Sequence, residues 1–136
     1  MTPDFIEAIL DWPWTWPIAR FALVAMFLTS GLTKVVNFSG AVTEMVDAGM
    51  PAPTIMALLS ILVELIGSVL VLINRWAWLG AGMLAAFTAI GAVTAHAFWK
   101  VSGQARKDAI AVFFMHIGLI AAFALDALLA AGAHRG

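Results

Sequence analysis

Among the titratable side chains inside or at the ends of strongly apolar segments, four lie toward the same membrane face: Lys34, Glu64, His96 and His116. A charged group at mid-membrane costs roughly 2.5 to 3.5 kcal/mol on insertion scales, so Glu64 should be protonated, paired or facing a wet cavity. Histidine titrates near neutral pH and can both donate and accept hydrogen bonds. A series of such groups could conduct protons, or form the polar wall of a pocket for a quinone or another small molecule. A purely structural role is the alternative for each.

The depths of these groups indicate which of them meet. We count about 1.5 Å of helical rise per residue from the membrane face near Lys34. His96 then lies only a few Å deep, whereas His116 lies about 12 Å and Glu64 about 16 Å deep. Leaving either of the deeper two unpaired in hydrocarbon would cost several kcal/mol. We therefore predict that Glu64 and His116 lie within hydrogen-bond reach, directly or through one water, as the centre of a polar ladder that runs to the surface.

Two opposite charges, Arg20 and Asp126, lie near the other membrane face. Asp126 is about 27 Å from the face near Lys34, and Arg20 lies at the matching depth in its own segment. Either charge alone is costly in an apolar environment, so we predict that they form a structural ion pair.

The residue types exclude several kinds of chemistry. There is no Cys, so this chain alone supplies no thiol, disulfide or iron–sulfur ligand. Three His and Glu64 are suitable metal ligands, but no two share metal-ligand spacing on one helix, and His134 lies in the tail beyond the opposite face; no metal site is predicted. The net charge of −1 provides no basic field for nucleic acid. The chain has no catalytic set or electron carrier of its own, so the sequence leans against an enzyme without deciding it. The cofactor is unknown from the sequence, with quinone as a candidate.

The elements that position these residues are membrane-spanning helices. Hydrophobic residues make up 63% of the chain and charged residues 11%, whereas a soluble domain has roughly 25% charged residues. The 136 residues suffice for four crossings of about 20 residues with short loops. We place the crossings at approximately 17–34, 53–73, 76–98 and 108–131. The predicted fold is an all-α polytopic bundle of four transmembrane helices that forms one domain, 1–136.

Two shorter helices are expected to lie on the membrane surface. Residues 2–10 carry apolar side chains at helical spacing behind Pro3, which suits the first position of a helix. Residues 37–53 repeat this pattern behind Ser39, a candidate N-cap. The tryptophans between residues 12 and 16 suit the interface between lipid and water.

One stripe of the first crossing should face protein rather than lipid. Its members recur at spacings of three and four: Arg20, Val24, Phe27, Gly31 and Lys34. Gly31 would let another backbone approach closely. In the second crossing, Ser60, Gly67 and Ser68 share the side of Glu64.

The count of cations favours one orientation weakly. Four cations flank the first and third loops (Lys34, Lys100, Arg106 and Lys107), and three lie on the other side (Arg20, Arg75 and Arg135). The positive-inside rule then predicts cytoplasmic first and third loops, with both termini outside.

This pattern resembles the DoxX family of small four-helix membrane proteins, which is sometimes placed with the Surf4-like proteins. The resemblance covers about residues 20–123. It rests on the order and spacing of Arg20, Phe27, Ser30-Gly31, Lys34, the Ala48-Gly49-Met50-Pro51 turn, Glu64, His96-Ala97-Phe98, Phe114, His116 and Gly118. Many members have Lys-Asn where this chain has Met115-His116, so a role for a cation there is not carried over. The resemblance implies the bacterial inner membrane and an association with redox systems, either thiosulfate:quinone oxidoreductase or oxidative-stress complexes, but no catalytic residue set.

Three functions remain open from the sequence. The first is an accessory or quinone-binding subunit of a redox or quinone-linked membrane complex. The second is a transporter of protons or a small solute, and the third is a purely structural assembly subunit. The expected partners are the lipid bilayer and other membrane subunits, or further copies of the chain, and no nucleic acid.

Overall fold

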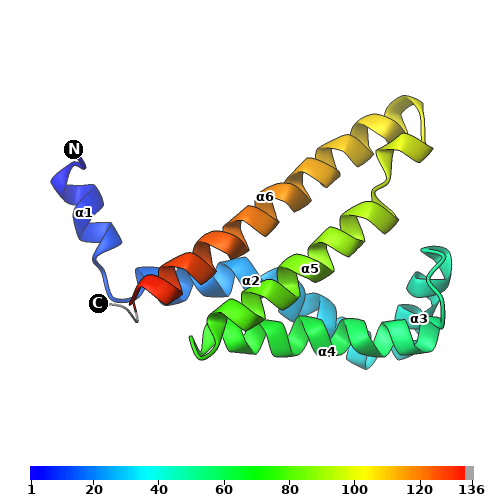
Figure 1. Ribbon diagram of the computed structural model, residues 1–136, viewed down its shortest axis with the longest axis horizontal. Helices are drawn as coiled ribbons and strands as arrows, with labels where there is room; N and C mark the ends of the chain where they lie inside the picture. The colour runs from blue at the N-terminus through cyan, green and yellow to red at the C-terminus, as the bar shows by residue number, and fades with distance from the viewer. Residues whose placement is uncertain (134–136) are drawn as a thin grey trace.

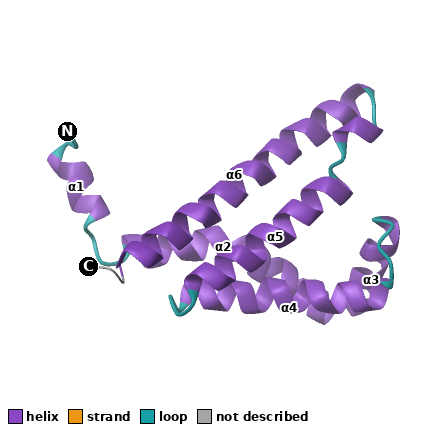
Figure 2. Ribbon diagram, in the orientation of Figure 1, coloured by secondary structure: helices purple, strands orange, loops and turns teal. Residues whose placement is uncertain are grey.

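The structure, a computed structural model, describes residues 1–133. Its elements are α1 (Asp4–Leu10), α2 (Thr15–Val36), α3 (Phe38–Asp47), α4 (Pro53–Leu72), α5 (Ala77–Ala95), the 3-10 helix η1 (Phe98–Lys100) and α6 (Gly103–Ala133). Within these residues every regular element is a helix (Figure 2), which confirms the predicted all-α class. Four segments of the described chain are long and apolar enough to cross a membrane: Thr15–Val36, Pro53–Leu72, Ala77–Lys100 and Gly103–Gly132.

The four long helices pack in the order α2, α4, α5, α6. Helix α4 packs against both α2 and α5, and α6 packs along α5. Figure 1 shows the start of α2, the α4–α5 turn and the end of α6 at one end of the bundle, while α5 and α6 diverge from α2 and α4 toward the other end. Helix α3 packs on α4 at that far end, and α1 projects away from the bundle. Which end faces the cytoplasm stays a prediction, and Arg135, which was counted for it, lies outside the described residues.

The helix ends differ from the predicted crossings where the backbone breaks. The first two crossings nearly coincide with α2 and α4, but α5 ends at Ala95 because His96 leaves helical geometry, with φ −121° and ψ 37°. Helix α6 begins at Gly103 rather than at Asp108. Asp108 is not the predicted cap, because it lies one turn inside the helix and accepts a hydrogen bond from Gln104 Nε2 at 2.9 Å.

The two short helices form with different caps from those predicted. Asn37, not Ser39, caps α3, because Asn37 Oδ1 accepts from the Gly40 N–H at 3.1 Å and also from Ser39 Oγ at 3.2 Å. Pro3 precedes α1 instead of occupying its first turn. No residue of α1 is buried, and the position of both helices on the membrane surface stays a prediction.

The predicted protein-facing stripe of the first crossing is confirmed. The buried residues of α2 are Arg20, Val24, Phe27, Gly31 and Lys34. The side of α4 that carries Glu64 is likewise buried, together with Ser60, Gly67 and Ser68. The hydrophobic core consists of Val24, Phe27, Val71, Ala81, Leu84 and Phe123. On α2, the core residues Val24 and Phe27 lie between Arg20 and Lys34.

Candidate functional site

A buried polar cluster joins α2 to α4. Lys34 Nζ lies 3.0 Å from Glu64 Oε1 and donates to Ser60 Oγ at 3.2 Å. Ser30 Oγ donates to the same Glu64 oxygen at 3.0 Å. Glu64 is only 2% exposed, and the Lys34 ammonium lies 5.5 Å from the centroid of the Phe87 ring. We call Lys34, Glu64, Ser30 and Ser60 the lysine–glutamate cluster.

A glycine on α2 lets this cluster form. A Cβ added at Gly31 would lie 2.7 Å from Leu65 Cδ2 and 3.4 Å from Glu64 Cβ, so α4 approaches the bare face of α2 at this point. Lys34 is one helical turn further along the same stripe, from where its long stem reaches Glu64. The pair places both charges where their mutual attraction and hydrogen bonds offset the cost of burial.

One oxygen of the cluster has no hydrogen-bond partner. Within residues 1–133, the buried side-chain atoms without a partner are Glu64 Oε2, Ser68 Oγ, Arg20 Nη2 and Asp126 Oδ2. Ser68 is one helical turn from Glu64 on the same buried side of α4. Buried polar groups are normally satisfied, whereas Glu64 Oε2 is an unpaired acceptor beside the Lys34 ammonium.

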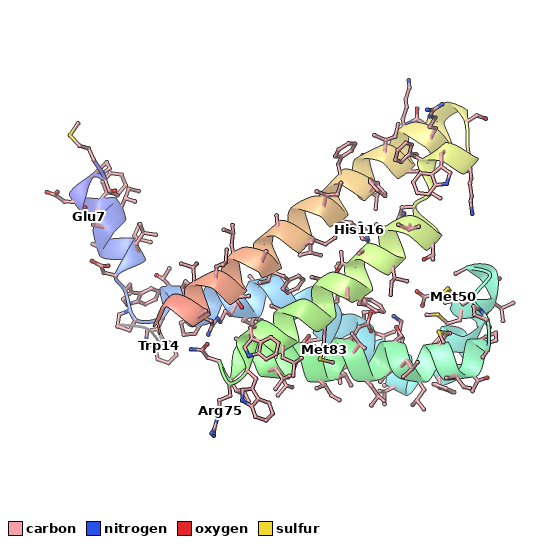
Figure 3. All side chains as sticks on the ribbon, in the orientation of Figure 1. Glu7, Trp14, Met50, Arg75, Met83 and His116 are labelled. Atoms are coloured by element: carbon pink, nitrogen blue, oxygen red, sulfur yellow. The ribbon has the colours of Figure 1, made fainter. Side chains whose placement is uncertain are left out.

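The predicted contact between Glu64 and His116 is wrong. His116 Nδ1 lies 2.8 Å from the carbonyl oxygen of Val112 on its own helix, and its ring lies beside His96, with centroids 4.9 Å apart. Glu64 instead uses Lys34 and Ser30. The two residues were matched by depth alone, whereas the bundle places α5, not α4, beside this part of α6. Figure 3 shows His116 on α6, on the side of α5.

The polar ladder is therefore two separate sites. Lys34 and Glu64 lie between α2 and α4, and His96 and His116 lie between the end of α5 and α6. Beside His96 is an open pocket of about 360 Å³. Its lining is Ala95, His96, Ala97, Val101, Ala105, Asp108, Ala109 and Val112.

The remaining charged pair joins α2 to α6. Arg20 Nε lies 2.9 Å from Asp126 Oδ1, and the two side chains are 4% and 7% exposed. The guanidinium of Arg20 lies over the ring of Trp16, 4.8 Å from its centroid. Phe27 and Phe123 also meet across these helices, with centroids 5.6 Å apart. The structure thus brings together the two charges matched by depth, and their structural role stays a prediction.

The sequence places Ser60 on the side of Glu64, but it did not predict the Lys34–Glu64 pair or the serine hydroxyls that bond it. Ser30 lies four residues before Lys34, and Ser60 lies four residues before Glu64. A hydroxyl one turn from a buried charge was the available signal, because residues four apart share a helix face. Among the described residues no three His, Asp or Glu side chains converge as a metal-binding group, and His134 lies outside the described residues.

These features define a polytopic four-helix membrane protein whose first spanning helix carries a paired cation near each end. The chain matches the DoxX family over residues 15–97. Because this match covers more than half of the chain, the protein belongs to the DoxX family.

A curated relative supports the same assignment. The chain is 28% identical over 116 residues to the inner membrane protein YphA of Escherichia coli (strain K12), a match that covers 85% of this chain and 83% of that protein. No solved structure matches the chain. Together with the four candidate spans, this relative confirms the predicted location, that of a multi-pass inner membrane protein.

Proposed function

We propose that this protein is an accessory subunit of a redox or quinone-linked membrane complex, and that α6 contacts the partner subunit. The observation that carries this proposal is the low burial of α6. Only 11% of its spanning window is buried within the chain, against 28%, 39% and 33% for the spans of α2, α4 and α5. A helix that packs mainly along one neighbour leaves the rest of its surface for lipid or for another protein.

The exposed face of α6 has a shape suited to a protein neighbour. Phe114, Gly118, Ala121 and Leu125 are exposed at helical spacing, and a Cβ at Gly118 would meet nothing within 4 Å. Lipid tails are as apolar as leucine, so helices associate in membranes through close packing at small residues. The redox context of the proposal comes from the family resemblance. This chain has no Cys to hold an iron–sulfur cluster, so a partner subunit would supply the electron carrier.

Photo-crosslinking in native membranes tests the proposal. A photoreactive residue at Leu125 should give a discrete crosslinked protein, whereas the same residue at Ile66 on the exposed face of α4 should react mainly with lipid. Mass spectrometry of the Leu125 product should identify a redox protein. Equal lipid labelling at both positions would remove the basis for the partner contact, and a crosslink to a second copy would indicate a homo-oligomer instead.

A quinone at the lysine–glutamate cluster is a second candidate, favoured by the unpartnered Glu64 Oε2. A lysine ammonium has three N–H donors, and Lys34 uses two of them on Ser60 and Glu64. The third could donate to a quinone carbonyl, while Glu64 Oε2 could accept from a quinol hydroxyl. The Phe87 ring beside Lys34 supplies an apolar wall.

Quinone retention by the purified protein tests this second candidate. Glu64→Gln should lose retained quinone, because the amide replaces the charged acceptor. Asp126→Asn is the matched control, since it changes another buried carboxylate in the same way at the other end of the bundle. Equal retention in both variants, or equal loss, would reject a quinone site at the cluster.

The transporter alternative has less support. The lysine–glutamate cluster and the Arg20–Asp126 pair lie near opposite ends of α2, and the core residues Val24 and Phe27 lie between them on the same stripe, 0% and 3% exposed. A buried apolar core between two polar groups opposes proton transfer from one to the other. A pH-dependent flux in liposomes containing the protein alone would favour this alternative over the accessory role.

A further inference from the structure

Two histidines from different elements meet where the end of α5 lies beside α6. His96 follows the last turn of α5, and His116 lies in the middle of α6. Their ring centroids are 4.9 Å apart with an interplanar angle of 50°, and both side chains are half-buried. Neither the accessory role nor the lysine–glutamate cluster uses this pair.

The hydrogen bond of His116 fixes which ring nitrogen is free. Its Nδ1 lies 2.8 Å from the Val112 carbonyl oxygen. A carbonyl oxygen only accepts hydrogen bonds, so Nδ1 carries the proton and Nε2 of the neutral ring keeps its lone pair. Within residues 1–133 this is the one hydrogen bond that either ring makes. A backbone carbonyl is one of the groups, together with carboxylates and water, that accept from the second ring nitrogen of metal-binding histidines and orient the ring.

The spacing of the rings suits one shared metal ion. Two imidazoles that bind one ion through nitrogens about 2.0 to 2.1 Å away, on tetrahedral bonds, have ring centroids about 5 Å apart. We propose that His96 and His116 bind a transition-metal ion of the Zn²⁺ or Cu²⁺ class, for which imidazole is a preferred ligand. The sequence predicts no metal site because no two of its ligands share metal-ligand spacing on one helix. That criterion does not apply to a pair formed by two different elements.

The surroundings define the kind of metal site. The pocket of about 360 Å³ beside His96 gives the ion a route from outside, and Asp108 in its lining adds a negative charge. Lys100 ends η1, and Arg106 and Lys107 lie in the first turns of α6. All three are exposed, so water and salt screen their repulsion of a bound cation. No third His, Asp or Glu within the described residues converges on the pair. Water must therefore complete the coordination, as in a site that exchanges its ion and unlike a closed structural zinc site.

Metal titration of the full chain in detergent, purified without a polyhistidine tag, tests the proposal. With one equivalent of Cu²⁺, electron paramagnetic resonance should show coupling to two nitrogens, and Zn²⁺ should compete for the site. His96→Ala and His116→Ala should each weaken binding at least tenfold and leave one coupled nitrogen. His134→Ala is the matched control, because it removes the third histidine, and it should bind as the wild type does.

A measurement on the unmodified protein covers the case in which an alanine variant fails to fold. Zn²⁺ should protect His96 and His116 from carbethoxylation by diethyl pyrocarbonate, as mapped by mass spectrometry, and should leave His134 reactive. Unchanged metal binding in the His96→Ala/His116→Ala double variant would overturn the proposal. So would equal labelling of all three histidines with and without Zn²⁺.

Discussion

Lys34 and Arg20 lie on the same buried stripe of α2, and each is paired with one carboxylate, yet the surroundings of the two pairs differ. Lys34 also donates to the Ser60 hydroxyl, and Glu64 also accepts from the Ser30 hydroxyl. This pair lies between α2 and α4, which pack closely at Gly31. Arg20 makes one charged contact, to Asp126 of α6, and α6 packs mainly along α5. The comparison teaches that a similar pair can lie within an interface that is already formed, or can help to hold a loosely attached helix in place.

The largest effect is expected from separating the partners of the lysine–glutamate cluster. Lys34→Met leaves Glu64 buried without its cation, which should lower the free energy of unfolding by about 3 to 5 kcal/mol. Unfolding in mixed detergent micelles, followed by circular dichroism, measures the loss. Lys100→Met changes an exposed lysine and should have little effect. If both variants unfold alike, the burial of the cluster does not govern stability.

A somewhat smaller effect is expected at the pair that holds α6. Arg20→Met or Asp126→Leu alone should each destabilise the protein by about 3 kcal/mol, because each leaves one buried charge unpaired. The double variant should be more stable than either single variant, since no lone charge remains. Simple additivity of the two single losses in detergent melting would argue against a direct contact.

The close approach of α2 and α4 gives a third prediction. Gly31→Ala places a methyl group 2.7 Å from Leu65 Cδ2, which should cost about 1 to 3 kcal/mol of unfolding free energy by overpacking. Gly82→Ala is the control, because a Cβ there would meet nothing within 4 Å. Equal melting temperatures of these two variants would contradict the proposed reason for the glycine.

The smallest effect is expected from a single hydroxyl of the cluster. Ser60→Ala removes one acceptor of the Lys34 ammonium and should cost about 1.5 kcal/mol, the low end for a hydrogen bond to a charged group, because Glu64 keeps the ammonium paired. The exposed Ser102→Ala controls for loss of a hydroxyl as such. A loss as large as that of Lys34→Met would mean that Ser60, rather than Glu64, is the main partner of the lysine.

The sequence predicts the helices and their buried faces better than it predicts which faces meet. Apolar length placed the four spans, and spacings of three and four residues predicted the five buried residues of α2. Both signals are local, because they depend on the geometry of one helix. The order of helices around the bundle is not local. Depth alone therefore predicts a contact between Glu64 and His116, whereas the partner of Glu64 is Lys34 on the adjacent helix.

The backbone near residue 96 illustrates a second limit. An apolar run continues from α5 to Phe98, but His96 and Ala97 leave the helix before η1 begins. Hydropathy does not distinguish a helix from an apolar segment that bends. That bend is also what turns His96 toward His116, so the contact was not apparent from the sequence.

The lengths of α4 and α6 have a consequence for the membrane itself. The span of α4 has 20 residues and that of α6 has 30, which correspond to about 30 Å and about 45 Å of helix. A hydrocarbon layer of about 30 Å matches α4 but is too thin for an upright α6. This hydrophobic mismatch requires α6 to tilt or to extend its polar first turns, with Arg106 and Lys107, beyond the lipid. Bilayer thickness thereby becomes a variable that acts on the angle between α6 and the rest of the bundle.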